Sequence, residues 1–302
     1  MKLIFFGAGS FAIPALQALV NIHDICLVIC PPPKPVGRNM QQKSCPLAQV
    51  AQTLALPLIE NTEVATIRSD IRQQQADALV VCDYGHLLPT DMLTLTPRGA
   101  LNIHSSLLPR WRGAAPILRA LLAGDNETGV TIMQMDAGLD SGKILLQQKT
   151  PIMPTTTGSE LHDTLAMIGA QLIIQVLSEN PTAVAQDDSQ ATYAKKITNV
   201  DRQLNFNQPA IAAWRQVRAF APQPCAYTVL ADKHIKVRTA TVRNVQGTPG
   251  EILSISSDGI VIACANNALA LLEVQRAGKR FITAADFLRG FKLPIQKTAS
   301  II

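Results

Sequence analysis

The sequence lacks the cysteine patterns by which small domains hold a metal or a disulfide framework. Its six cysteines form no Cys-x-x-Cys pair, and none stands at zinc-ligand spacing from a histidine. Cys26, Cys30 and Cys82 lie in apolar runs, where cysteine behaves as a small core residue. We therefore expect no metal, no disulfides and a reducing, cytoplasmic environment.

The apolar run at the amino terminus is short. It ends at Gly7, too early for the core of a signal peptide or for a membrane span, so residues 3–6 are predicted to form a first strand. The chain also has no internal repeat and no low-complexity tract. With 47% hydrophobic and 16% charged residues over 302 positions, it is long enough for two folded domains and is not disordered.

An acidic residue is missing where a dinucleotide-binding fold needs one. Gly7-Ala8-Gly9-Ser10-Phe11-Ala12 matches the G-x-G-x-x-G/A fingerprint between a predicted strand and a predicted helix. The second strand, however, ends in Cys30-Pro31-Pro32, with no carboxylate for a ribose hydroxyl. A tight turn and close helix–strand packing explain the small residues equally well, and a nicotinamide-dependent dehydrogenase is kept as an alternative.

Charge is divided unevenly along the chain. Residues 1–202 hold 15 Lys/Arg and 17 Asp/Glu, a net charge of −2, whereas residues 203–302 hold 12 and 5, a net charge of +7; together they give +5. A near-neutral front part with a basic rear part suggests a catalytic domain beside a domain that binds a polyanion. Ordinary surface variation would give the same numbers.

The order of apolar and amphipathic segments predicts the fold class. Residues 1–190 alternate short apolar strands with helices, which predicts an α/β domain with a doubly wound, mostly parallel sheet. Residues 130–135 and 144–148 flank a polar turn and are expected to be antiparallel. Residues 191–207 are predicted to be a linker, and short strands spaced by turns in residues 208–302 predict a small β-barrel.

The clearest chemical signal lies on the predicted strand 100–104. Residues two apart on a strand share a face, so Asn102 and His104 project together while Leu101 and Ile103 pack on the other face. An amide and an imidazole are costly in a buried strand unless they are paired or used. At the carboxyl end of a strand in an open α/β sheet, they suit acyl-type chemistry, which needs an oxyanion held and protons moved.

Three loops supply further candidates. The polar turn at residues 136–142 offers Asp136 and Asp140 as carboxylates that could orient His104, and the residues alone do not choose between them. The stretch Arg110-Trp111-Arg112 suits either an anionic or aromatic substrate or internal packing of a loop. The proline-rich loop with Lys34, Arg38 and Lys43 could grip phosphates or be a solvated surface loop.

These pieces occur together in one family. Residues 102–117, residues 129–136 and the run Leu139-Asp140-Ser141-Gly142 closely resemble the signatures of folate-dependent formyltransferases. The Arg-Trp-Arg-Gly-Ala-Ala-Pro-Ile extension at 110–117 and Met133-Gln134-Met135-Asp136 are similar to the branch that acts on methionyl-tRNA. The resemblance covers nearly the whole chain.

The resemblance implies a function and a set of residues. It implies transfer of a formyl group from 10-formyltetrahydrofolate to the α-amine of initiator methionyl-tRNA, by a cytoplasmic monomer without a metal. It places the catalytic trio on Asn102, His104 and Asp140, which chooses Asp140 over Asp136. The folate contacts fall on residues Tyr84, Gly85, Ser106, Leu107, Leu108 and Pro109. The tRNA-binding insertion falls on the loop with Lys34, Arg38 and Lys43, and the barrel is expected to resemble an OB-fold.

Other functions remain open at this stage. One is a folate-dependent formyltransferase that acts on a small amine, such as a sugar nucleotide or glycinamide ribotide. Another is a tRNA-binding module without catalysis. Loss of activity on deletion of residues 203–302 would argue against the small amine, and formyl transfer itself would exclude the binding module.

Overall fold

The structure, a computed structural model of the chain, describes residues 1–37 and 40–290. It divides into two compact units. The first unit comprises Met1–Pro116, Glu127–Pro151 and His162–Lys195, and the second comprises Ile117–Asn126, Ile152–Leu161 and the chain from Lys196 onward. Each unit has its own sheet, and the two units are described separately below.

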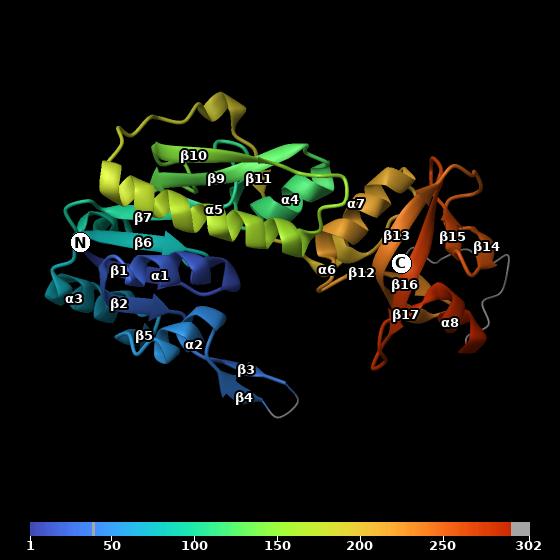
Figure 1. Cartoon of the computed structure of the whole chain (residues 1–302), viewed down its shortest axis with the longest axis horizontal. Helices are drawn as coiled ribbons and strands as arrows, with labels where there is room; N and C mark the ends of the chain where they lie inside the picture. Colours follow the sequence, from blue (N-terminus) through green and yellow to red (C-terminus); the bar gives the residue numbers. More distant parts are fainter. Residues whose placement is uncertain (38–39, 291–302) are drawn as a thin grey trace. The chain divides into compact units, whose positions relative to one another are not determined.

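The first unit is built on a mostly parallel sheet (Figure 1). Among the described residues, seven strands lie in the order β10-β9-β7-β6-β1-β2-β5. Strands β1, β2, β5, β6 and β7 are parallel to their neighbours, β9 is antiparallel to β7, and β10 is antiparallel to β9. The predicted doubly wound sheet with an antiparallel excursion is therefore confirmed. The strand bounds are β1 Lys2–Gly7, β2 Asp24–Cys30, β5 Leu58–Glu60, β6 Ala78–Cys82, β7 Ala100–His104, β9 Glu127–Gln134 and β10 Ile144–Pro151.

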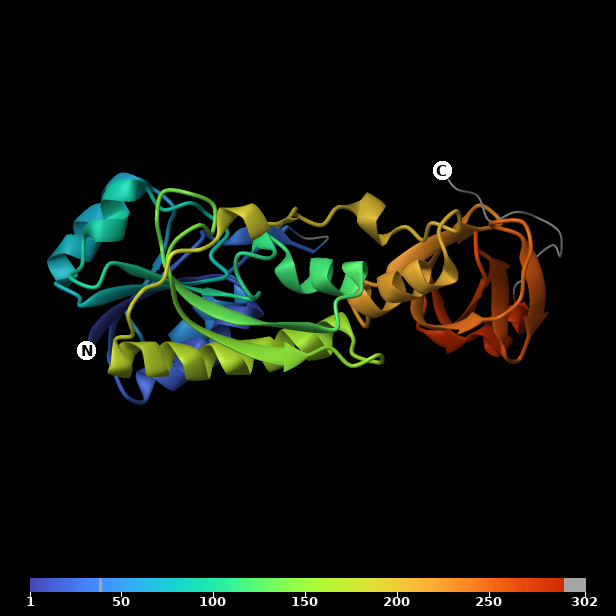
Figure 2. The ribbon, with the colours of Figure 1, turned by 90° about the horizontal axis from the view of Figure 1, so that it is seen from above.

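Both faces of this sheet are covered, which explains why its central strands are almost continuously apolar. Ile67 and Ile71 of α3 pack on the face that carries Phe6 and Val81. On the other face, Gly169 of α5 lies so close to Ile103 that a Cβ atom there would be 2.7 Å from Ile103 Cγ2. Figure 2 shows α3 and α5 on opposite sides of the sheet. The helices of this unit are α1 Ile13–Val20, α2 Pro46–Thr53, α3 Val64–Gln74 and α5 Gly158–Glu179, of which the first turn is grouped with the second unit. Helix α4, Pro116–Ala123, belongs to the second unit except for Pro116.

Helix α4 begins and ends where its sequence predicts. Pro116 occupies its first position, where the missing N–H costs nothing. Gly124 follows its last residue with φ of +80°, a left-handed conformation that stops a helix.

The predicted basic loop folds into a small hairpin. Strands β3 (Lys34–Val36) and β4 (Gln41–Lys43) pair antiparallel, with Lys34 opposite Lys43. Both lysines are exposed. Arg38, which the resemblance places in the tRNA-binding insertion, lies outside the described residues.

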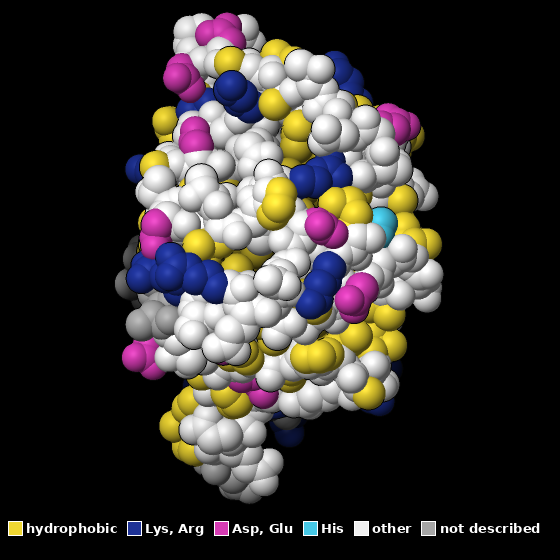
Figure 3. Space-filling model, turned by 90° about the vertical axis from the view of Figure 1, so that its left-hand side faces the viewer, with side chains coloured by type: hydrophobic (Ala, Val, Ile, Leu, Met, Phe, Trp, Pro, Cys, Tyr) yellow, Lys and Arg dark blue, Asp and Glu magenta, His cyan; other side chains and the backbone are white. Residues whose placement is uncertain are grey.

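The first unit carries no single-sign surface in the view of Figure 3. There, Lys and Arg side chains are interspersed with Asp and Glu side chains. That mixture agrees with the near-neutral charge of residues 1–202.

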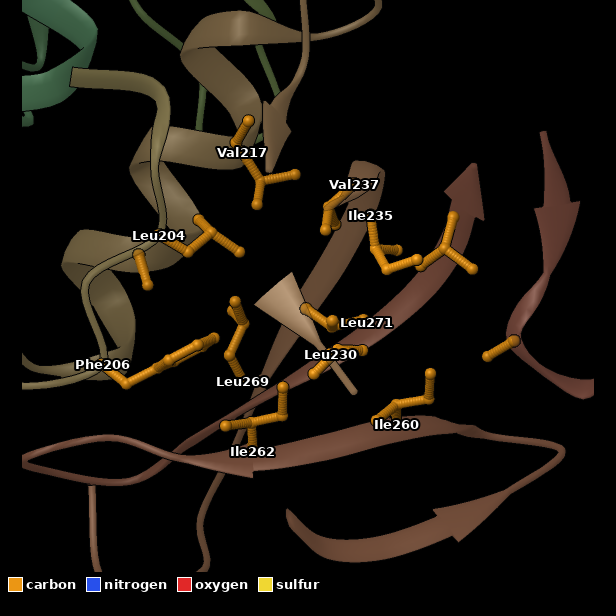
Figure 4. Close-up of a cluster of buried hydrophobic side chains, with 14 of the residues drawn as sticks. Leu204, Phe206, Val217, Leu230, Ile235, Val237, Ile260, Ile262, Leu269 and Leu271 are labelled. Atoms are coloured by element: carbon orange, nitrogen blue, oxygen red, sulfur yellow. The ribbon is translucent and has the colours of Figure 1, made fainter. Parts of the chain in front are cut away.

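The second unit has an antiparallel sheet, built from the short strands spaced by turns that the sequence predicts. Among the described residues, its strands lie in the order β12-β13-β16-β15-β14, with β17 paired to β16. Large aliphatic side chains and Phe206 fill its core against Val217 of α7 (Figure 4). Its elements are α6 Asn199–Arg202, α7 Ala210–Phe220, β12 Ala226–Leu230, β13 Lys233–Arg243, β14 Ile252–Ser256, β15 Gly259–Ala263, β16 Ala268–Arg276, β17 Ile282–Thr283 and α8 Ala284–Gly290.

The polar stretch before this unit is more ordered than its composition suggests. Within it, Tyr193–Ala194 forms β11 and pairs in parallel with β8 (Arg112–Gly113). A pairing of two residues on each side has no periodic sequence signature, which is why the sequence did not predict it.

Candidate functional site

Asn102 and His104 lie at the carboxyl end of β7, as the strand alternation predicts. Asn102 pairs with Val81 of β6 and Met133 of β9, and His104 pairs with Thr131. His104 is buried, with 6% of its surface exposed, while Asn102 is half-buried. The two polar side chains are therefore carried by a rigid central strand rather than by a loop.

The imidazole of His104 faces an acceptor on each ring nitrogen. Its Nε2 atom lies 3.0 Å from the carbonyl oxygen of Trp111, which only accepts, so Nε2 carries a proton and donates. Its Nδ1 atom lies 3.7 Å from Oδ2 of Asp140. That separation is longer than a hydrogen bond but short enough for a strong charge interaction when the ring is protonated.

Asp140 is fixed by the main chain that follows Trp111. Its Oδ2 atom accepts a hydrogen bond of 2.8 Å from the backbone N–H of Gly113. Its own backbone is left-handed, with φ of +50°, a conformation uncommon outside glycine. The carboxylate that orients an imidazole thus depends on a loop held in an unusual shape.

Asp136, the other candidate carboxylate, forms hydrogen bonds within the turn at residues 136–142. Its oxygens accept hydrogen bonds from Ser141 Oγ at 2.9 and 3.1 Å and from the backbone N–H of Gly138 at 3.0 Å. The structure therefore brings Asp140, and not Asp136, to the histidine.

The side-chain amide of Asn102 is unpaired within residues 1–37 and 40–290. No hydrogen bond from it to the described chain is present, although its neighbours in the sheet are fully paired through their backbones. A half-buried amide without a protein partner is a donor and acceptor available to a ligand.

Ser106 to Pro109 form a tightly bonded turn beyond His104. The hydroxyl of Ser106 donates to the carbonyl of Arg110 at 2.6 Å, and its own carbonyl accepts from Thr131 Oγ1 at 2.6 Å. The Leu108 N–H in turn donates to Thr131 Oγ1 at 3.1 Å. The Ser106 hydroxyl is therefore engaged with the protein, whereas Leu107 and Pro109 are partly exposed.

A cavity of about 270 Å³ lies next to Tyr84, after the end of β6. The ring of Tyr84 meets Phe6 edge-on, at 5.3 Å between centroids, and burial raises the pKa of the Tyr84 phenol. Gly85 follows with φ of +75°. The lining residues are Thr62, Ile67, Tyr84, His86, Leu87, Leu88, Pro89 and Met92. Of these lining residues the sequence prediction included Tyr84, while Gly85, which was also predicted, is not among them. The prediction named none of the other lining residues as site residues.

The glycine-rich turn after β1 is shaped by a carboxylate rather than by a nucleotide motif. A Cβ atom at Gly9 would lie 1.8 Å from Oδ2 of Asp83, so a larger residue would force the Asp83 carboxylate to move. Burial raises the pKa of the Asp83 carboxyl, and the charge of nearby His162 opposes this effect. His162 also lies 3.2 Å, through Nε2, from Ser10 Oγ.

Arg110 and Arg112 have different roles. The guanidinium of Arg110 stacks over the ring of Trp111, at 4.5 Å from its centroid. The Arg112 side chain is only 5% exposed and binds Gln186 and Asp188 inside the unit. The interpretation of this stretch as loop packing is therefore the one that the geometry supports. Gln186 was not predicted as a site residue, because no motif or spacing in the sequence marks it.

Within the described ranges, no three His, Cys, Asp or Glu side chains are grouped so as to hold a metal ion. The candidate site is thus an amide, an imidazole and a carboxylate around the end of β7, with a cavity lined by both polar and apolar groups after β6.

The chain is similar to known proteins over almost its whole length. Residues 1–177 match the formyl transferase family, and residues 196–292 match the formyl transferase C-terminal domain. The methionyl-tRNA formyltransferase of Ruegeria pomeroyi is 42% identical over 299 residues, covering 97% of this chain and 98% of that protein. The methionyl-tRNA formyltransferase of Thiobacillus denitrificans is 45% identical over 298 residues, covering 96% of each.

A solved structure shares the fold. The N-formyltransferase of Helicobacter canadensis, in complex with folinic acid and dTDP-3-aminofucose, superimposes with a TM-score of 0.68 over 91% of this chain and 99% of that chain. Its sequence is 18% identical. At that identity, the likeness bears on the fold alone.

Proposed function

The chain belongs to the formyl transferase family, and on this premise we propose that Asn102, His104 and Asp140 carry out its reaction. The function is that of a methionyl-tRNA formyltransferase, which follows from identities of 42–45% to such enzymes along the full chain. The observation that carries the assignment of residues is the 3.7 Å approach of His104 Nδ1 to Asp140 Oδ2 beside the unpaired amide of Asn102.

The reaction moves a formyl group from N10 of 10-formyltetrahydrofolate to the α-amine of methionine esterified to initiator tRNA. An α-amine has a pKa of about 8, so a useful neutral fraction exists at neutral pH. Its lone pair attacks the formyl carbon and a tetrahedral oxyanion forms. The amine nitrogen then loses a proton, the bond from carbon to N10 breaks, and N10 gains a proton as it leaves.

Asn102 stabilises the oxyanion in this proposal. Its amide NH₂ is the donor at the strand end that no described residue occupies, and a β-strand holds it in place before substrate binds. Donors arranged in advance around a developing negative charge are worth roughly 3–4 kcal/mol of barrier each.

His104 and Asp140 supply and move the proton. Because Nε2 donates to Trp111, the ring approaches the reacting atoms from its Nδ1 side, next to Asp140. The Asp140 carboxylate orients the ring, and a ring that carries a proton on Nδ1 can donate it to the oxyanion or, through water, to the leaving nitrogen. Gly113 keeps the carboxylate turned toward the ring.

The folate contacts extend from the cavity beside Tyr84 to the turn at Ser106–Pro109. The cavity offers polar groups of Thr62 and His86 beside the ring of Tyr84 and aliphatic side chains, so it can contact both the polar and the apolar parts of a folate. Tyr84, Gly85, Leu107, Leu108 and Pro109 contribute surface and shape. Ser106 contributes by holding the turn through Arg110 and Thr131.

The tRNA contacts include the β3–β4 hairpin. Lys34 and Lys43 lie opposite each other at its base, and both are exposed. The family resemblance adds Arg38 to the proposed tRNA contacts. Pairs of exposed lysines suit phosphate contacts, which position a nucleic acid without reading its sequence. The basic second unit adds to this attraction. We place the enzyme in the cytoplasm, where initiator tRNA is used, as a monomer.

The direct test is incubation of the protein with a labelled formyl donor and charged initiator tRNA. Uncharged tRNA and free methionine serve as controls, and sugar-nucleotide amines and glycinamide ribotide test the small-amine alternative. We expect label on methionyl-tRNA only. Equal formylation of free methionine, or faster formylation of a small amine, would contradict the proposal.

A further inference from the structure

A stretch of chain outside the reacting centre lies against the Asp140 loop. This stretch, residues 184–194, is here called the strap. At one end of it, Val184 and Ile144 exchange two backbone hydrogen bonds of 2.8 Å, each N–H donating to the other's carbonyl. At the other end the strap forms β11 and pairs with β8. Its composition is polar and aperiodic, so nothing in the sequence sets it apart from a linker.

Gln186 of the strap forms hydrogen bonds to the main chain of the Asp140 loop. Its Nε2 atom donates to the carbonyl of Asp140 at 2.8 Å and to the carbonyl of Gly142 at 2.7 Å. Both hydrogens of the amide are thereby used. Asp140 has the left-handed conformation, and these two hydrogen bonds hold the peptides on either side of the turn to the strap.

Arg112 sets the direction of this amide. Its Nε and Nη2 atoms donate to Gln186 Oε1 at 3.0 and 2.8 Å, and Nη2 also donates to Asp188 Oδ1 at 2.7 Å. Oε1 must therefore face the guanidinium and Nε2 must face the loop. Burial acts to lower the pKa of Arg112, but its hydrogen bonds to Asp188 and Tyr193 outweigh burial and raise it. The group is thus a permanent cation with its donors committed.

Three consecutive residues connect this network to the proposed centre. Trp111 accepts from His104, Arg112 holds Gln186, and Gly113 donates to the Asp140 carboxylate. The strap pairs with β8 and Thr192 accepts from the backbone N–H groups of Trp111 and Arg112, so the strap fixes the segment 111–113 that holds His104 and Asp140.

We propose that Gln186 and Arg112 are positioning residues that set the distance between His104 and Asp140. The inference rests on the proposed function of that pair. Neither residue needs to touch substrate, because each acts through hydrogen bonds to the loop and to β8. A shift of about 1 Å in a reacting group can cost about 100-fold in rate, which is why such a support matters for turnover.

The test uses two substitutions at Gln186 and matched ones at Gln190. Gln186→Glu still accepts from Arg112 but cannot donate to the loop, and Gln186→Met loses both functions. Gln190 lies on the same strap, and its amide donates only to Asp187 Oδ2, at 2.8 Å on the surface. Gln190→Glu and Gln190→Met therefore control for changes in the strap itself.

We expect kcat for methionyl-tRNA to fall about 10- to 100-fold in both Gln186 variants, with the KM for tRNA within about twofold of wild type. In an Asp140→Asn background, adding Gln186→Glu should lower kcat by less than about threefold further, because the carboxylate that Gln186 positions is gone. Equal kcat for the Gln186 and Gln190 variants, or a full independent loss in the Asp140→Asn background, would overturn the proposal.

A second readout does not depend on catalysis. Hydrogen exchange of the Gly113 amide, which donates to Asp140, should be faster in Gln186→Glu than in Gln190→Glu. Wild-type protein that formylates no amine would refute the proposed function and leave this measurement to decide the role of Gln186. Unchanged exchange would then reject that role.

Discussion

Gly9 and Asp83 lie in contact across the carboxyl ends of β1 and β6: a Cβ atom on Gly9 would be 1.8 Å from Oδ2 of Asp83. The glycine-rich turn thus makes room for a carboxylate of the protein. Close packing of this kind calls for the same small residues as a dinucleotide fingerprint.

Gly9→Ala should therefore destabilise the first unit. Overpacking of this kind costs about 1–3 kcal/mol, since the carboxylate or the turn must move. Thermal unfolding measures the effect. In an Asp83→Ala background the same change should cost far less, and an equal cost in both backgrounds would contradict the contact.

Asp83 should also make stability depend on pH. Burial raises its pKa in the folded state, with His162 opposing, so the folded protein binds the proton more tightly than the unfolded chain. Its contribution is present at acid pH and is lost as pH rises through the raised pKa. The melting temperature of wild type relative to Asp83→Asn should thus increase as pH is lowered from neutrality toward about 4. If the difference in melting temperature between wild type and Asp83→Asn decreased as pH is lowered, the pKa of Asp83 would not be raised by folding.

The same cluster shows what sequence can and cannot establish. The strands, the α4 boundaries at Pro116 and Gly124, and the shared face of Asn102 and His104 follow from local rules of spacing and turn chemistry. Gly9 was recognised as a turn residue, but its partner Asp83 lies 74 positions away, and no local pattern connects the two. Long-range contacts of single residues leave no period to detect.

The sequence also did not predict that the strap contacts the Asp140 loop. Residues 184–194 are polar and lack the alternation of a strand, and β8 and β11 contain two residues each. Gln186 acts through an amide and two carbonyls, so any glutamine in the sequence would have been an equal candidate. The choice between Asp136 and Asp140 likewise needed either a family resemblance or the coordinates, because both sit in the same polar turn.

Lys34 and Lys43 should affect tRNA binding and not chemistry. Removing one lysine that neutralises a phosphate reduces the slope of log affinity against log salt by about 1, so Lys34→Ala with Lys43→Ala should lower the slope by about 2 and raise the KM for tRNA. Lys149→Ala is the control, because Lys149 is 70% exposed and pairs with Glu127. A salt dependence equal to that of the control would exclude the hairpin from the tRNA contact.

Asn102→Ala should slow turnover without unfolding the protein. Its amide makes no hydrogen bond to the described chain, so its removal leaves no buried partner unsatisfied. The loss of one oxyanion donor should reduce kcat by about 100- to 1,000-fold while the melting temperature changes little. Turnover close to that of wild type would mean that another group holds the oxyanion.

The pair His104 and Asp140 is the centre of the account, and kcat in a double-mutant cycle tests it most directly. His104→Ala should reduce the rate of methionyl-tRNA formylation by at least about 100-fold, and Asp140→Asn should reduce it as well. Because the two groups act as one unit, the double variant should be about as slow as the slower single variant. Near-wild-type turnover in His104→Ala, or losses that multiply in the double variant, would contradict the assignment.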